Sequence, residues 1–174
     1  MQIYLKIKFG ITIISVMIIT YIISYDNGFY QKSTIKEWSG LKWSDFEGVV
    51  KHLNIHDVSL HVEIYIKYDS LNKKYLAFAG QNNKLSWKRK SVKNDSLLLR
   101  HEQYHFNITE YFARKMNETM DKMVINNDED FKHELKVIRE KSWTMQESYD
   151  DDTNHSLNRK NQTIWESKID SLLK

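Results

Sequence analysis

Residues 95–116, DSLLLRHEQYHFNITEYFARKM, carry the clearest structural signal in this chain. Their apolar residues recur at intervals of three and four, which is the period of an amphipathic helix, and Asp95 is a suitable N-cap. The same period continues to about Met123, so the sequence predicts one long helix over residues 95–123. Its apolar stripe consists of Leu98, Ile108, Phe112, Met116, Met120 and Met123.

This stretch contains an HExxH motif at His101, Glu102 and His105. Residues four apart on a helix lie one turn above each other, so both imidazoles can bind one metal ion, and Glu102 beside them can act as a general base. All three residues fall within the apolar stripe, where such groups are costly to bury unpaired. We therefore predict a Zn²⁺ site. The alternative is that one histidine is hydrogen-bonded in the core and the other is exposed.

A zinc site with an open position needs a third protein ligand. The segment YDDDTNH, residues 149–155, is predicted to be a polar loop before the last helix. His155 is the predicted third ligand, and Asp150 is the alternative. Tyr149 is a candidate catalytic residue, as a donor to a developing oxyanion.

Other histidines and acids fit a metal site less well. Glu110 faces away from the apolar stripe and is better placed as an i,i+4 salt-bridge partner of Arg114. His52 and His56 have the i,i+4 spacing but no adjacent carboxylate, and His133 lies in a charge-rich stretch typical of an exposed helix face.

The rest of the chain predicts strands before the long helix and helices after it. Alternation of apolar and polar residues predicts a half-buried strand over residues 58–68. A short strand and turn are expected at 41–48, and shorter strands at 74–79 and 85–92. The strand at 85–92 is a candidate edge for pairing with an extended peptide. Helices are expected at 49–53, 128–140 and 157–173. This order indicates an α+β fold, with a small antiparallel sheet packed on the long helix.

Composition excludes several classes of function. The chain has 174 residues, enough for one domain with a core, and no cysteine, so disulfides, thiolate metal sites and cysteine nucleophiles are excluded. The net charge of +3 is too small and too evenly spread to indicate a nucleic-acid partner.

The N-terminus has the layout of a targeting segment. Residues 9–25 carry no charge, and Lys6 and Lys8 precede them. Small residues of a cleavage site are missing, which favours an uncleaved anchor, and the positive-inside rule places the rest of the chain outside the cytoplasm. We expect residues 1–28 to be a signal anchor or signal peptide. Residues 29–174 are then the extracytoplasmic domain of a single-pass membrane protein, secreted if the signal is cleaved. The alternative is a buried core segment.

Several short motifs occur together in one order. Residues 98–114 are close to the pattern LLxHEQxHFDIxExxAR, and L-x-W-x-D-F-x-G, S-W, Y-D-x-x-T-x-H and Q-x-x-W are also present. These four motifs fall at Leu41, Trp43, Asp45, Phe46 and Gly48; Ser86 and Trp87; Tyr149, Asp150, Thr153 and His155; and Gln162 and Trp165. The set resembles an uncharacterised family of bacterial proteins described as secreted zinc-dependent proteases. The resemblance covers about residues 41–173 and implies a zincin-like fold, bound zinc, a peptide or protein substrate, and His155 as the third ligand.

Two residues depart from the family pattern: Asn107 stands where the family has Asp, and Ser156 where it has Gly. If that Asp orients a ligand imidazole, Asn does so without a charge, which weakens catalysis. The rival function is therefore a non-catalytic, membrane-tethered domain that binds an envelope component, with a structural metal or none.

Overall fold

The computed structural model describes residues 34–50, 57–122 and 128–174. The predicted signal segment, the domain boundary after residue 28 and most of the helix predicted at 49–53 lie outside these ranges. The helices and strands described below all belong to the unit Ile35–Lys174. None of the helices in the described ranges combines the length and apolar character that a membrane span requires.

The predicted α+β class is confirmed. In the described residues a three-stranded antiparallel sheet has the order β1-β4-β3, and β2 and β5 form a second antiparallel pair. The elements are β1 (Ile35–Glu37), the 3-10 turn η2 (Trp43–Asp45), β2 (Val58–Ser59), β3 (Val62–Asp69), β4 (Lys74–Asn82), β5 (Trp87–Lys88), α2 (Ser96–Lys122), α3 (Asp128–Thr153) and α4 (Arg159–Leu172).

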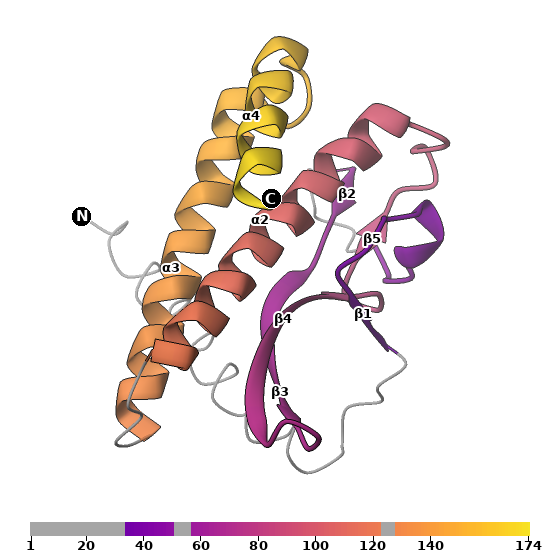
Figure 1. The fold of residues 1–174 in the computed structure, drawn as a ribbon. Coiled ribbons are helices and arrows are strands. Elements are labelled where there is room, and N and C mark those ends of the chain that lie inside the picture. The colour runs from indigo at the N-terminus through magenta and orange to yellow at the C-terminus, as the bar shows by residue number, and fades with distance from the viewer. Residues whose placement is uncertain (1–33, 51–56, 123–127) are drawn as a thin grey trace, which may run out of the picture. The chain divides into compact units, whose positions relative to one another are not determined.

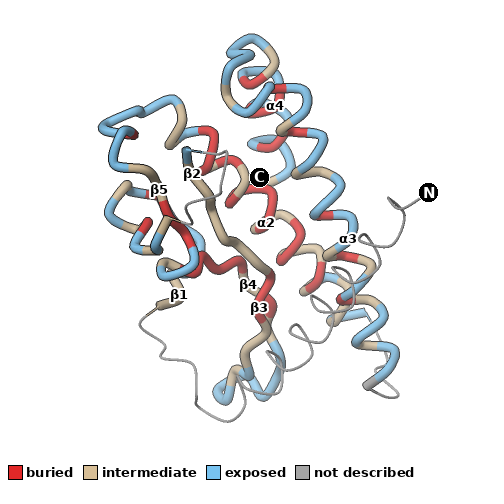
Figure 2. The backbone as a smooth tube through the Cα atoms, turned by 180° about the vertical axis from the view of Figure 1, so that it is seen from behind, coloured by how far each residue is buried: buried red, intermediate tan, exposed pale blue. Residues whose placement is uncertain are grey.

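Helix α2 is the centre of the fold. It lies between the three-stranded sheet and the pair formed by α3 and α4 (Figure 1). Buried residues follow α2 and β4, while the outer turns of α4 and the tip of the β3–β4 hairpin are exposed (Figure 2). Because neighbours cover α2 on several sides, its buried residues extend beyond the predicted stripe to Phe106, Asn107 and Thr109.

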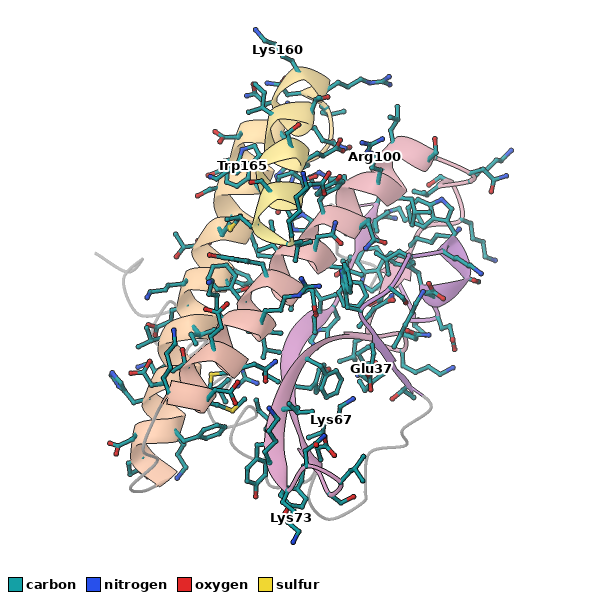
Figure 3. The ribbon with its side chains drawn as sticks, viewed as in Figure 1. Glu37, Lys67, Lys73, Arg100, Lys160 and Trp165 are labelled. Carbon is teal, nitrogen blue, oxygen red and sulfur yellow. The ribbon has the colours of Figure 1, made fainter. Side chains whose placement is uncertain are left out.

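Polar contacts from α4 and the C-terminus fix the position of α2. Arg100 donates two hydrogen bonds to the Glu166 carboxylate, at 2.8 and 2.6 Å. One turn further along α2, the Tyr104 hydroxyl lies 3.1 Å from both carboxylate oxygens of Asp170. Arg100 on α2 and Trp165 on α4 lie at the same end of the helices (Figure 3). These contacts hold the turn of α2 that carries the HExxH motif against α4.

The sheet differs from the predicted strands in three places. The strand predicted at 58–68 is interrupted at Leu60–His61. The Asn82 amide still donates to the His61 carbonyl in the register of β3 and β4, but the His61 amide donates to Ser86 Oγ and not to β4. Of the strand predicted at 85–92, only β5 forms, and the rest of the prediction is wrong. Before β5, the amides of Leu85 and Ser86 both donate to the Asn82 carbonyl and form a turn. Of the short strand and turn predicted at 41–48, the turn is confirmed as a 3-10 turn at residues 43–45, where Asp45 Oδ2 accepts from the Lys42 amide at 2.7 Å, while the described residues 41–48 contain no strand.

Helix α3 is longer than predicted, which changes the site. It continues through Thr153, so residues 149–153 are its last turn and the prediction of a polar loop there is wrong. The buried positions Leu135, Ile138, Ser142, Tyr149 and Thr153 keep a helical spacing against α2 and α4. Tertiary packing of this face outweighs the polar composition of the segment.

We expect Gly48→Ala to lower the free energy of unfolding by about 1–3 kcal/mol, the usual cost of forcing extra atoms into a packed region. A Cβ at Gly48 would lie 2.7 Å from the Lys84 carbonyl oxygen and 2.8 Å from that of Ser86, and both are backbone atoms that cannot move aside easily. Gly40→Ala is the matched control, because a Cβ there meets no atom within 4 Å. Urea unfolding of the two variants measures the difference, and equal midpoints would contradict the steric argument.

Candidate metal centre

The HExxH motif begins in the second turn of α2, shortly after the N-cap of this helix. Asp95 Oδ1 accepts from the amides of Leu97 and Leu98 at 3.0 and 2.9 Å, which confirms Asp95 as the N-cap. The predicted helix is thus confirmed, and it places the rings of His101 and His105 one turn apart in an edge-to-face arrangement, with centroids 4.7 Å from each other.

Three potential ligand atoms converge between α2 and α3. The Nε2 atoms of His101 and His105 are 3.1 Å apart, and Asp150 Oδ1 lies 3.0 Å from the first and 2.9 Å from the second. His101, His105 and Asp150 form a group that could hold a metal ion. The pair of histidines is the one predicted from the sequence, and Asp150 is the residue that the sequence offered as the alternative third ligand.

The donor set fits a divalent cation. Two imidazole nitrogens and one carboxylate are a common zinc ligand set, and bonds of about 2.0–2.1 Å in tetrahedral geometry separate the ligand atoms by about 3.4 Å, a few tenths of an ångström more than here. Asp150 also supplies a negative charge beside the Nε2 atoms of His101 and His105, which face each other. His101 Nδ1 is buried without a hydrogen-bond partner among the described residues.

The electrostatics of the three groups are coupled. Burial lowers the pKa of the His101 imidazole, and the nearby His105 adds to this effect. Burial also opposes the charged form of His105, but Asp150 and Glu102 outweigh it and raise the pKa of His105. Burial alone would raise the pKa of Asp150, yet its hydrogen bonds with His101 and His105 hold it well below the usual range of a carboxyl. Asp150 is therefore a carboxylate at neutral pH.

His155 lies beside this group but outside it. Its Nδ1 is 3.4 Å from Asp150 Oδ1, and its side chain is 59% exposed. Asn154, His155 and Ser156 all have positive φ, of 46°, 48° and 77°, so the chain turns sharply after α3. Glycine would adopt the φ of Ser156 without strain, whereas serine does so at a cost. A ligand role for His155 stays a prediction.

Glu102 is buried next to the ligand pair. It is 8% exposed, and no hydrogen bond to its carboxylate is found among the described residues. Burial raises its pKa to about 7, with His105 opposing and Asp150 reinforcing that shift. A carboxyl with such a pKa can both accept and return a proton near neutral pH.

Tyr149 packs directly on both histidines. Its ring stacks on His101 at 4.6 Å between centroids and meets His105 edge-on at 4.9 Å. The residue is fully buried, and its hydroxyl has no hydrogen-bond partner within the described ranges. Burial raises the pKa of this hydroxyl, so it remains a donor. The sequence offered Tyr149 as an oxyanion donor but did not place it near His101 and His105, and the structure brings its ring to this pair.

Asn107 does not orient a ligand imidazole. Its Oδ1 accepts from Trp38 Nε1 and from Gln103 Nε2, both at 2.9 Å. The Gln103 side chain also binds the backbone of residues 39 and 41. The Oδ1 atom of Asn107 therefore fastens the segment after β1 to α2 and does not contact a ligand imidazole. The effect of the missing charge on catalysis stays a prediction.

Two further predictions are confirmed, while His52 and His56 lie outside the described residues. Glu110 pairs with Arg114 at 2.8 Å, and His133 is exposed on α3. Gln146, which the sequence pattern did not identify, contacts His105 from α3. It lies one turn before Asp150 on α3. The sequence predicted this helix only to residue 140, so it gave no sign that Gln146 and Asp150 share a helix face.

Comparison of the chain with protein-family models, with curated protein sequences and with solved structures finds no match. The arguments for function therefore come from the residues and their geometry.

Proposed function

We propose that this chain is a zinc-dependent metallopeptidase with a zincin-like catalytic domain in residues 29–174. The observation that carries the proposal is the convergence of His101 Nε2, His105 Nε2 and Asp150 Oδ1 within about 3 Å of one another, with buried Glu102 next to them. The resemblance of the HExxH helix to secreted zinc-dependent proteases supports the same reading.

The chemistry is peptide-bond hydrolysis with Glu102 as general base. When bound to the three ligands, a zinc ion would polarise the substrate carbonyl and lower the pKa of water to about 7. Glu102 takes a proton from the attacking water and returns it to the leaving amine, for which a carboxyl pKa of about 7 is well matched. Tyr149 donates its otherwise unpartnered hydroxyl to the developing oxyanion.

The proposed location is the cell envelope. Residues 1–28 would hold the catalytic domain at the membrane as a single-pass anchor, or direct its secretion if they are cleaved. The substrate is then a peptide or protein on the extracytoplasmic side. Signal-peptide processing in cells, measured by the mass of the mature N-terminus, distinguishes the anchored form from the secreted form.

The third ligand can be tested by two substitutions. We expect Asp150→Asn to lower Zn²⁺ affinity by at least about 100-fold, because it removes a charged ligand and not an outer contact, whose loss alone costs 10–100-fold. His155→Ala should change the affinity by only a few-fold, since its side chain is largely exposed and contacts Asp150 from outside the group. Chelator competition with the full chain measures both. The opposite order of effects would make His155 the ligand and Asp150 its support.

A second candidate function is a structural metal site in a non-catalytic envelope-binding domain. It is favoured by the 3.4 Å approach of His155 Nδ1 to Asp150 Oδ1, which puts a fourth potential ligand beside the other three. Four protein ligands would close the coordination shell, whereas catalysis needs an open position. In the Co²⁺-substituted protein, a change of the visible spectrum on adding acetohydroxamate indicates the open site, and an unchanged spectrum indicates the closed one.

A further inference from the structure

The side chain of Gln146 reaches from α3 to three groups on α2. Its Oε1 lies at hydrogen-bond distance from His105 Nδ1. Its Nε2 donates to the backbone carbonyl of His105 at 3.3 Å and to Thr109 Oγ1 at 3.0 Å. The Thr109 hydroxyl in turn donates to the same His105 carbonyl at 3.1 Å. One amide thus contacts both the ring and the backbone of a proposed ligand.

These contacts fix which ring nitrogen of His105 carries the proton. A backbone carbonyl only accepts hydrogen bonds, so the Gln146 atom beside it must be the NH₂ group. Because the Thr109 hydroxyl uses its proton on that carbonyl, its oxygen accepts from the same NH₂ group. The amide oxygen of Gln146 therefore faces His105 Nδ1, and an oxygen without a proton requires Nδ1–H as its donor. In the neutral ring, Nε2 then presents a lone pair toward His101 and Asp150.

Without Gln146 the other tautomer would be favoured. Asp150 Oδ1 lies 2.9 Å from His105 Nε2 and is a charged acceptor for a proton there. A proton on Nε2 would occupy the lone pair that a metal ion needs. The His101 ring has no such hydrogen bond to orient it. Its Nδ1 has no partner among the described residues, and the ring stacks on Tyr149 instead.

We infer that Gln146 is a positioning residue of the metal centre, which keeps the proton of His105 on Nδ1 and leaves Nε2 ready to bind a divalent cation. The binding of a metal ion in this inference rests on the proposed function, whereas the tautomer of His105 is a property of the metal-free chain. Thr109 assists by orienting the Gln146 amide. Outer partners of this kind orient a ligand ring and raise its basicity, and their removal costs about 10–100-fold in metal affinity.

The test is Gln146→Met in the full chain, which keeps a side chain of similar length and removes the amide. We expect Zn²⁺ affinity, measured by chelator competition, to fall by about 10–100-fold. In the metal-free protein, at a pH high enough for the His105 ring to be neutral, ¹⁵N NMR of the histidine rings should show His105 as Nδ1–H in the wild type and mainly as Nε2–H in the variant. A merely structural role for Gln146 would not change the tautomer.

Two further variants separate this role from a packing defect. Gln146→Glu keeps an acceptor for Nδ1–H but loses the donor to the His105 carbonyl and Thr109, so His105 should stay Nδ1–H and the Zn²⁺ affinity should fall less than in Gln146→Met. Gln162→Met is the matched control, because it is the same substitution at a buried glutamine whose amide donates to Glu166 at 3.1 Å, away from His105. It should leave both readouts unchanged.

The outcomes distinguish this inference from the proposed function. If the wild-type chain binds no Zn²⁺, the proposed function fails, and the tautomer of His105 in the wild type and in Gln146→Met still decides the role of Gln146. If the wild type binds Zn²⁺ and Gln146→Met binds it equally well with His105 unchanged, the inference alone is overturned. A wild-type His105 protonated on Nε2 overturns it as well.

Discussion

Glu102→Gln is expected to bind zinc as well as the wild type and to hydrolyse peptides about 10²–10⁴-fold more slowly, the usual contribution of a general base. Glutamine keeps the size of the side chain but cannot take a proton. Glu102 is not among the three converging ligand residues, so the metal should remain at full stoichiometry. Metal content by mass spectrometry and kcat on a fluorogenic peptide library, measured on the same preparation, test both halves of this expectation.

Glu110→Gln is the matched control for this experiment. Glu110 lies on the same helix and pairs with Arg114 at 2.8 Å, away from the ligand atoms. The substitution is the same in chemistry and should leave hydrolysis within a few-fold of the wild type. Equal rates for Glu102→Gln and the wild type would mean that the activity comes from a contaminant or that Glu102 is not the base.

His105→Ala is expected to abolish metal binding at micromolar Zn²⁺, with a loss of affinity of more than about 100-fold, since even the loss of an outer partner costs 10–100-fold. Bound metal stabilises only the folded state, by about 2.7 kcal/mol when its concentration is one hundred times Kd. Added Zn²⁺ should therefore raise the Tm of the wild type and leave that of His105→Ala unchanged. The comparison with and without metal removes any loss of stability due to the missing ring.

His133→Ala controls for the removal of an imidazole. His133 is exposed on α3 and belongs to no converging group, so this variant should keep the wild-type affinity and the rise of Tm with Zn²⁺. A rise of Tm in both His101→Ala and His105→Ala equal to that of the wild type would place the bound metal elsewhere in the chain.

Local signals predicted the helix that carries the candidate site. The N-cap at Asp95 and the apolar period place α2 at Ser96–Lys122, and the spacing of His101 and His105 then brings their rings together. Cap geometry and i,i+4 contact depend only on residues close in the chain, so both can be derived from a single stretch of sequence.

Contacts between distant residues were predicted less well. The strand expected at 85–92 is reduced to β5, preceded by a turn in which the Leu85 and Ser86 amides bond to Asn82, and Asn107 binds Trp38 instead of a ligand ring. In both cases a polar group had several possible partners. Which partner it found depended on how segments far apart in the sequence pack together.

The HExxH motif, the α+β order of elements and the absence of cysteine ligands follow from the amino-acid sequence, because they rest on residue type and on short-range periodicity. The place of Asp150 in the ligand group and the contact of Gln146 with His105 follow only from the tertiary structure. Both depend on α3 continuing as a helix through Thr153 and packing against α2, and the burial of its Tyr149 face stabilises that extension more than its polar residues oppose it.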